Sequence, residues 1–205
     1  MDSYRIPTKS GASEYVDKRS RFLGLVRPVG SEDEARTIIA ACKKQYHDAR
    51  HNCWCYLLRD GTERYSDDGE PQGTAGQPML NVFQRQEVWN VCCVVTRYFG
   101  GTLLGAGGLV RAYTDATKAA IEAADVVTVS VCVDIILEVP YSLYEQLCRI
   151  AEAAGTKLAE SDFAENVLLT FRMLDGTQAP FLEKLTELTR GQSEIIVTAP
   201  FDAAF

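Results

Sequence analysis

Three carboxylates that lie close together in the sequence are the residues best suited to chemistry. Asp67, Asp68 and Glu70 fall within four residues, a spacing at which acidic side chains can hold Mg²⁺ or act as an acid and base pair. The same segment is equally typical of a turn in which Asp side chains accept hydrogen bonds from backbone N–H groups. Because no second carboxylate cluster completes a metal site, the turn is favoured, and no metal or cofactor is expected.

His51 is the remaining candidate for acid–base chemistry, because it and His47 are the only histidines. Together with the three carboxylates it would form the site of a hydrolase-like enzyme acting on a phosphorylated or nucleotide-like substrate. The chain has no Gly-x-Ser-x-Gly motif, and no cysteine has a cationic or helix-start setting that would activate its thiol. No catalytic residue is therefore assigned, and a non-enzymatic role is favoured over catalysis.

Glycines surround these charged residues and indicate a binding surface. Eight of the 15 glycines fall within residues 63–113, and glycine permits positive φ and close backbone approach. A strand ends near Arg97, a glycine-rich loop follows, and a helix starts at residue 107 or 108, so free N–H groups would attract an anion. The candidate anion-binding residues are Thr74, Gly76, Arg97, Gly100, Gly101, Gly105, Gly107, Gly108 and Arg111.

This glycine-rich loop also has a purely structural interpretation. It matches neither the dinucleotide-binding fingerprint nor the Walker loop, so nucleotide binding of a standard kind is not supported. A partly buried guanidinium needs a counter-charge, so Arg97 requires either a bound anion or one of the three nearby carboxylates. In the second case an ion pair would join the carboxylate segment to the glycine-rich loop, and this loop would only pack the strand against the helix.

The composition limits the class of protein. Hydrophobic residues make up 46% and charged residues 24%, and no apolar run approaches the roughly 20 residues that span a bilayer, so a cytoplasmic protein is expected. The seven cysteines contain no Cys-x-x-Cys pair and are expected to be free, buried thiols. The net charge of −7 falls within residues 132–205, which makes that part a poor nucleic-acid binder.

The first 130 residues have the pattern of a mixed domain. Hydrophobic periodicity predicts strands over 12–16, 21–29, 51–59 and 90–98, and helices over 32–45, 77–88 and 107–124. Ser31 and Glu34 would form a capping box at the first helix. Cys53 and Cys55 should share one face of their strand, with Trp54 on the other.

The pattern changes after about residue 126. Residues 126–139 are long enough for a closing strand and a new strand, and further elements are expected at 141–154, 157–163, 167–174, within 175–190, and at 194–199. The order strand-helix-strand-strand-helix-strand is that of a ferredoxin-like split βαβ unit. We therefore predict an α+β protein with domains at 1–130 and 131–205.

Three segments together closely resemble the YigZ/IMPACT family: residues 48–53, 65–78 and 96–113. The resemblance covers residues 15–120 firmly, and the tail is similar to the small second domain of bacterial YigZ-type members. It implies an N-terminal domain similar to domain 2 of ribosomal protein S five. It also implies a ferredoxin-like βαββαβ C-terminal domain resembling the last domain of elongation factor G.

The resemblance also implies a class of partner. Eukaryotic relatives regulate translation by binding the large activator of a stress kinase, and they carry an N-terminal RWD domain that this sequence lacks. We therefore expect a regulatory protein that binds a translation-machinery protein, the ribosome or RNA through its glycine-rich face, without membrane contact. The sequence specifies neither the individual partner nor the oligomeric state.

Overall fold

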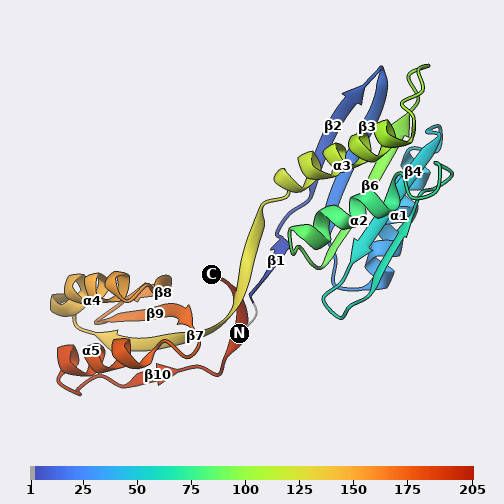
Figure 1. Cartoon of the computed structure of the whole chain (residues 1–205). Helices are drawn as coiled ribbons and strands as arrows, with labels where there is room; N and C mark the ends of the chain where they lie inside the picture. Colours follow the sequence, from blue (N-terminus) through green and yellow to red (C-terminus); the bar gives the residue numbers. More distant parts are fainter. Residues whose placement is uncertain (1–2) are drawn as a thin grey trace. The chain divides into compact units, whose positions relative to one another are not determined.

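The computed structural model describes residues 3–205 and contains two compact units. Tyr4–Val127 form the N-terminal unit, and Thr128–Phe205, together with Ser3, form the C-terminal unit (Figure 1). Each unit has one β-sheet with helices packed on it, and each encloses its own core of buried apolar side chains. The α+β fold class is confirmed.

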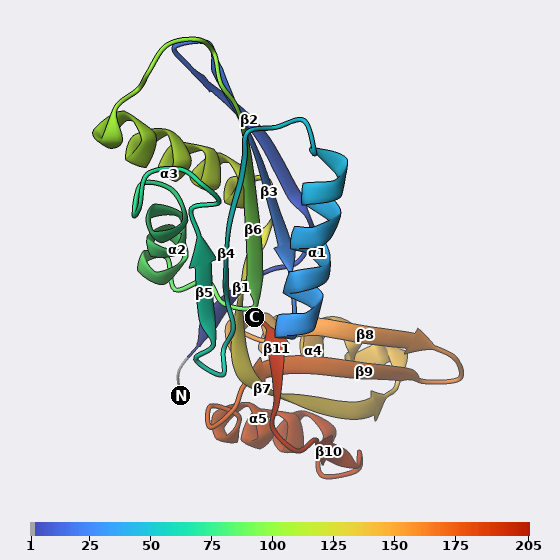
Figure 2. The ribbon, with the colours of Figure 1, turned by 90° about the vertical axis from the view of Figure 1, so that its right-hand side faces the viewer.

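The N-terminal unit is an antiparallel sheet in the order β2-β3-β6-β4-β5 with helices on both faces. Helices α2 and α3 cover one face and α1 covers the other (Figure 2). Its elements are β1 (Tyr4–Pro7), β2 (Gly11–Asp17), β3 (Ser20–Pro28), α1 (Glu32–Gln45), β4 (His51–Leu57), β5 (Glu63–Ser66), α2 (Gly76–Arg85), β6 (Val91–Tyr98) and α3 (Ala106–Glu122).

Burial on both faces explains the apolar central strands. In β4, Cys53 and Cys55 pack toward α2 and α3, whereas Trp54 packs toward α1, which confirms the predicted alternation. In β6, Val95 faces α2 and α3 while Val94 faces α1. A central strand covered on both faces is expected to be mainly apolar, and β6 is apolar from Val91 to Val95, with Thr96 and Arg97 near its end.

The helices of the N-terminal unit begin in different ways. At α1, the Ser31 Oγ accepts a hydrogen bond from the Glu34 N–H at 3.3 Å, as the capping box requires. The Glu34 carboxylate, however, accepts from the Gly30 N–H at 2.8 Å rather than from Ser31. Helix α3 begins after Gly105, whose φ of +73° is accessible mainly to glycine.

The C-terminal unit has the predicted ferredoxin-like order. Its elements are β7 (Val126–Val139), α4 (Tyr141–Ala153), β8 (Lys157–Phe163), β9 (Val167–Leu174), α5 (Ala179–Thr189), β10 (Ile195–Val197) and β11 (Phe201–Ala204). The strands pair antiparallel in the order β10-β7-β9-β8, and β11 also pairs with β7. Helices α4 and α5 pack on one face of this sheet.

Four elements differ from expectation, and the first of them is the short strand β1, which was not predicted. Residues 126–139 form one continuous strand, because their β-branched residues continue without a Gly or Pro between them. Strand β5 was not predicted, since it is an exposed edge strand with little apolar alternation. Strand β11 was also missed, because its four residues are too few to give a periodic signal.

Candidate functional site

The loop between β5 and α2 is held together by the carboxylate of Asp67. Its Oδ1 accepts hydrogen bonds from the N–H groups of Ala75 and Gly76 at 3.0 and 2.9 Å, and its Oδ2 accepts from Gly73 at 2.8 Å. These donors lie at the N-terminal end of α2, where backbone N–H groups are unpaired and the helix dipole favours an anion. The anion site of α2 is thus filled by a residue of the same chain.

Asp68 has a similar structural role. Its Oδ2 accepts from the Asn52 N–H at 2.7 Å, and its Oδ1 pairs with the Lys43 ammonium at 2.5 Å. Both aspartates therefore serve as hydrogen-bond acceptors, which is the turn interpretation of this segment. Within residues 3–205, no group of three or more His, Cys, Asp or Glu side chains is arranged to hold a metal ion.

Glu70 and Arg97 form a buried ion pair. The Arg97 Nη1 lies 2.6 Å from the Glu70 Oε1, and the two side chains are 6% and 3% exposed. The Tyr113 hydroxyl donates to the same carboxylate oxygen at 2.8 Å, and burial raises the pKa of Tyr113, which keeps it a donor. Of the two alternatives for Arg97, an internal carboxylate is the one present in the structure.

Strand register brings His51 to this ion pair. His51 lies opposite Arg97 where β4 pairs with β6, and Phe22 lies opposite Arg97 on the β3 side. The His51 Nδ1 is 2.9 Å from the Asp68 carbonyl oxygen, which can only accept, so Nδ1 carries the proton. The other ring nitrogen, Nε2, lies 3.9 Å from the Glu70 Oε2.

A cavity of about 370 Å³ opens above these residues. It is bounded by the start of β4, the loop before α2, the end of β6 and the loop that leads into α3. Its wall includes Arg50, His51 and Gly105, and its exposed rim carries Phe99 and Leu103, which are 41% and 82% exposed. We call this feature the glycine-loop cavity.

Only part of the predicted anion-binding set lines this cavity. Arg97 and Gly105 do, whereas Arg111 is exposed on α3 and is not part of the wall. Thr74 is buried, and its hydroxyl donates to the Pro71 carbonyl at 2.6 Å. Whether an anion binds to this set stays a prediction.

Most of the glycines have a structural reason. A Cβ on Gly76 would lie 2.9 Å from the Ser66 backbone, and one on Gly100 would lie 2.0 Å from the Arg19 carbonyl carbon. Gly101 has a φ of +84°, and a Cβ on Gly108 would lie 2.9 Å from the Leu104 Cβ. A Cβ on Gly107, in contrast, would meet open space at the start of α3.

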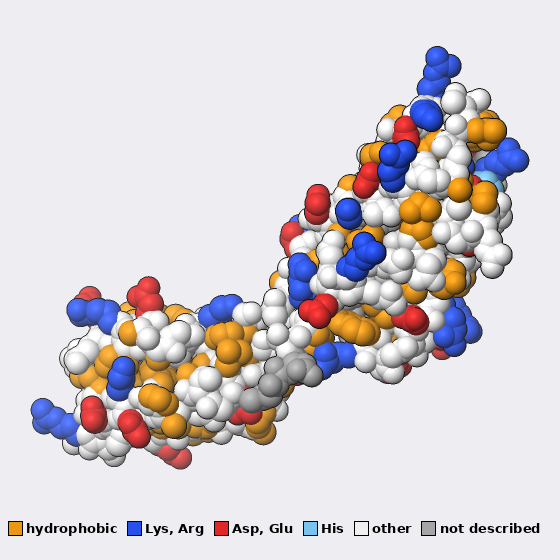
Figure 3. Space-filling model, in the orientation of Figure 1, with side chains coloured by type: hydrophobic (Ala, Val, Ile, Leu, Met, Phe, Trp, Pro, Cys, Tyr) orange, Lys and Arg blue, Asp and Glu red, His pale blue; other side chains and the backbone are white. Residues whose placement is uncertain are grey.

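Sequence reasoning gave no role to Phe99 and Leu103 at the cavity rim, nor to Lys18 and Arg19 in the neighbouring β2–β3 turn. Phe99 and Leu103 follow the strand in a loop, where an apolar side chain gives no sign of whether it is exposed. Lys18 and Arg19 form the exposed β2–β3 turn that packs against Gly100. Lys and Arg atoms are visible at this end of the N-terminal unit in Figure 3. The sequence signal that could have identified Lys18 and Arg19 is the presence of two adjacent cations in a predicted hairpin turn.

Comparison with known proteins identifies the relatives of this chain. The family model described as the Impact N-terminal domain matches residues 18–121, which contain the cavity. The chain belongs to the IMPACT family. A second model, described as a domain of unknown function (DUF1949), matches residues 137–192 in the C-terminal unit.

Bacterial IMPACT family members resemble the chain over most of its length. The member YvyE of Bacillus subtilis is 36% identical over 197 residues, which are 95% of this chain and 91% of that protein. The member YigZ of Escherichia coli is 30% identical and covers 96% and 98% of the two chains. A crystal structure described as a hypothetical protein is 28% identical, with a TM-score of 0.60 and 97% of this chain covered.

Eukaryotic relatives match about half of the chain. The rat protein named Protein IMPACT is 28% identical over 109 residues, which are 51% of this chain and 34% of the rat protein. No helix within the described residues is long and apolar enough to cross a membrane.

Proposed function

We propose that this IMPACT family member is a non-enzymatic regulatory protein that binds single-stranded RNA of the translation machinery through the glycine-loop cavity. The observation that carries the proposal is the exposed Phe99 ring at the rim of a cavity bordered by two arginines and the start of a helix. Aromatic rings and cations of this kind together hold single-stranded nucleic acids, because bases stack on the ring while phosphates meet the cations.

The electrostatics of the cavity favour a phosphate. The charge of Glu70 is balanced by Arg97 at 2.6 Å, so the remaining field comes from Arg50 and from the N-terminal end of α3. Gly105 and Ala106 line the cavity, and the first N–H groups of a helix have no partner within the helix. A helix N-terminus with unpaired N–H groups is a ready anion site.

Further cations extend this surface along the path a nucleic acid would follow. Lys18 and Arg19 are exposed in the β2–β3 turn, which contacts the glycine-rich loop at Gly100. Arg111, exposed near the start of α3, is a proposed flanking contact. A chain of nucleotides that extends from the cavity toward these residues would meet further cations, which suits RNA better than a single small anion.

The link to translation rests on the family. The resemblance described above implies that eukaryotic relatives regulate translation, and the matched Impact N-terminal domain, residues 18–121, contains the cavity. The three carboxylates of the glycine-rich region are engaged in internal hydrogen bonds or ion pairs. This arrangement supports binding over acid–base chemistry.

The proposal is tested by fluorescence anisotropy with a labelled oligouridylate of about 12 nucleotides over a salt series. We expect Phe99→Ala to weaken binding about 5- to 150-fold without changing the salt slope, since stacking contributes about 1–3 kcal/mol per base. The double variant K18Q/R19Q should reduce the slope by about 1.4 units, and Arg50→Gln by about 0.7. Arg85→Gln, an exposed arginine at the end of α2, is the matched control and should change neither quantity.

Absence of binding at about 50 mM salt would contradict the proposal. Equal effects of the control and the cavity variants would also contradict it, because such binding would reflect net charge alone.

A hydrolase-like activity on a phosphorylated substrate is the second candidate, and one observation favours it. The His51 Nδ1–H is fixed by the Asp68 carbonyl, which leaves Nε2 free to accept a proton beside the Glu70 carboxylate. This tautomer suits a general base. Release of nitrophenol from p-nitrophenyl phosphate, lost in His51→Gln, would support this candidate, whereas no release above the blank is expected under the first proposal.

A further inference from the structure

The C-terminal sheet has one face that the helices do not cover. Helices α4 and α5 pack against Ile135 and Leu137 of β7, so the alternate residues of this strand point to the opposite face. Directly opposed residues of antiparallel strands share a face. The strand register therefore places two rows side by side on the open face, namely Glu138, Leu168 and Asp162, and Ile196, Ile136 and Thr170.

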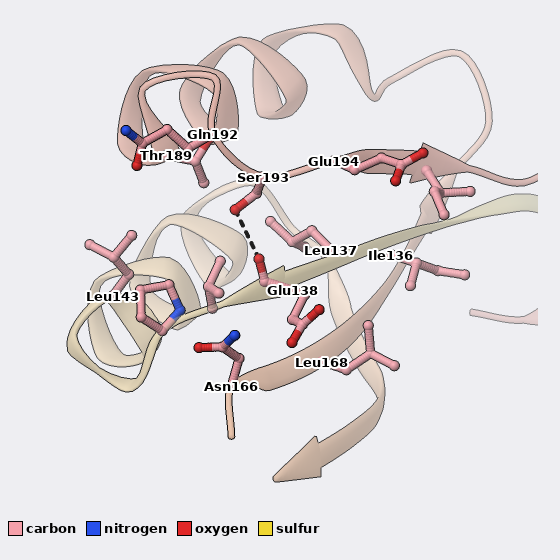
Figure 4. A pocket seen from close by; sticks show the side chains of 13 residues that line it. Ile136, Leu137, Glu138, Leu143, Asn166, Leu168, Thr189, Gln192, Ser193 and Glu194 are labelled. Carbon is pink, nitrogen blue, oxygen red and sulfur yellow. Dashed lines mark hydrogen bonds between the residues drawn. The ribbon is translucent and has the colours of Figure 1, made fainter. Parts of the chain in front are cut away.

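Apolar side chains on this face are accessible to solvent and border a cavity. Leu168 and Ile196 are 44% and 50% exposed, and Ile136 is half-buried. The cavity has a volume of about 430 Å³ and extends toward the chain that connects α5 with β10. Figure 4 shows Ile136, Glu138 and Leu168 gathered on one side of β7, and the Ser193 hydroxyl donating to the Glu138 carbonyl.

The charged side chains that line this cavity are all acidic. Glu138 and Glu194 line the cavity, no Lys, Arg or His does, and within residues 3–205 neither carboxylate forms a salt bridge. The nearest cation in the sheet register, Arg172, is held by both oxygens of Asp134 at 2.9 Å. The C-terminal unit as a whole carries 5 Lys and Arg against 12 Asp and Glu. A phosphate would be repelled here, whereas a cation would be attracted.

We propose that this acidic and apolar face binds a basic, partly apolar segment of a partner protein. Its apolar side chains would enter the cavity against Ile136, Leu168 and Ile196, and its Lys or Arg side chains would reach Glu138 and Glu194. Charge complementarity selects this occupant, because opposite potentials across an interface bring partners together and fix their register. A second copy of the chain docking through the same face would place carboxylates opposite carboxylates, which is unfavourable.

This interaction is separate from RNA binding by the N-terminal unit, and the experiment distinguishes the two. The full chain is titrated with a fluorescent synthetic peptide of alternating Lys and Leu, and with a counterpart in which Glu replaces Lys. We expect E138Q/E194Q to weaken Lys-Leu peptide binding about 3- to 10-fold, since each exposed ion pair contributes modestly. The matched control E183Q/E187Q removes the same charge from exposed positions of α5 and should leave binding unchanged.

Amide chemical shifts of the full chain locate the peptide. Perturbations should concentrate in β7, β9 and β10, and Phe99→Ala should leave them intact. Equal weakening of Lys-Leu peptide binding by the two double variants would overturn the proposal. So would binding of the Glu-Leu peptide as tight as that of the Lys-Leu peptide, or displacement of the Lys-Leu peptide from these strands by oligouridylate. Leu168→Ser provides a second variant with unchanged charge, and it should weaken binding while leaving the salt dependence as in the wild type.

Discussion

The ion pair between Arg97 and Glu70 gives the sharpest test of the site, because it decides whether the arginine is a structural residue. Replacing Arg97 by Leu leaves the Glu70 carboxylate buried, with the Tyr113 hydroxyl as its remaining close donor. Removing one partner of a buried ion pair costs about 3–5 kcal/mol of unfolding free energy, because the other charge is left uncompensated. Both side chains are at most 6% exposed, so this full range applies here.

Substitution of the other partner, Glu70, should lower the free energy of unfolding by a smaller amount. In Glu70→Gln the amide oxygen can still accept from Arg97 or Tyr113, but the charge of the guanidinium is no longer balanced. We expect a loss of about 2–3 kcal/mol, the scale of a hydrogen bond to a charged group. In the double variant R97L/E70Q no buried charge is left, so the loss should fall about 2 kcal/mol or more below the sum of the two single losses.

The two tryptophans make the measurement specific to the N-terminal unit. Trp54 and Trp89 both lie within Tyr4–Val127 and pack against its cores, so urea unfolding followed by tryptophan fluorescence reports that unit alone. Breaking the exposed Arg21–Glu14 pair by Arg21→Gln is the matched control and should leave the unfolding midpoint in place.

Additive losses in this cycle, or an Arg97→Leu variant as stable as the wild type, would refute the pairing. Arg97 would then be free to bind a ligand, and it would not anchor the loop before α2.

Three further outcomes follow from the structure. Gly100→Ala should destabilise the N-terminal unit by about 1–3 kcal/mol or more, because the new Cβ overlaps the backbone of the β2–β3 turn. Gly107→Ala should instead raise the free energy of unfolding by about 0.5–1 kcal/mol, because its Cβ meets open space, and urea unfolding compares the two variants. Burial raises the pKa values of Tyr113 and the Cys53 thiol, so these groups ionise at lower pH in the unfolded chain than in the folded one. The free energy of unfolding should therefore fall as the pH rises above about 9, and urea midpoints at pH 7 and 10 would show this. A fragment of residues 1–130 should fold alone, and hydrogen exchange without protected amides in it would contradict this.

The sequence predicted best those elements whose signal is local. The β8–β9 hairpin has the bounds that the sequence predicted, and α1 begins directly after its Ser31 cap. The ferredoxin-like order of the C-terminal unit followed from these local signals, because element order and short connections restrict the topology.

The partners within the site could not be predicted in the same way. Three carboxylates were equally available to Arg97, and the choice of Glu70 depends on how the loop before α2 is anchored by Asp67. His51 reaches the pair only because β4 and β6 align in one particular register. A shift by one residue would turn His51 to the α1 face, and sequence patterns around a single residue do not resolve such a shift.

The limits of glycine as a signal are also visible here. Part of the cluster lines the cavity, but Gly76 and Gly100 are needed for close backbone contacts rather than for ligand access. The exposed Phe99 and Leu103, on which the RNA proposal rests, have no feature in the sequence that separates them from core residues. Exposure of an apolar side chain is decided by tertiary packing.

Ultraviolet cross-linking in living cells, followed by sequencing of the RNA bound to the full chain, tests the central claim most directly. The account predicts enrichment of RNA from the translation machinery with the wild-type protein, and loss of that enrichment in the F99A/R50Q double variant. A comparable yield of RNA from the wild type and the variant, or no RNA above the uncross-linked sample, would contradict it.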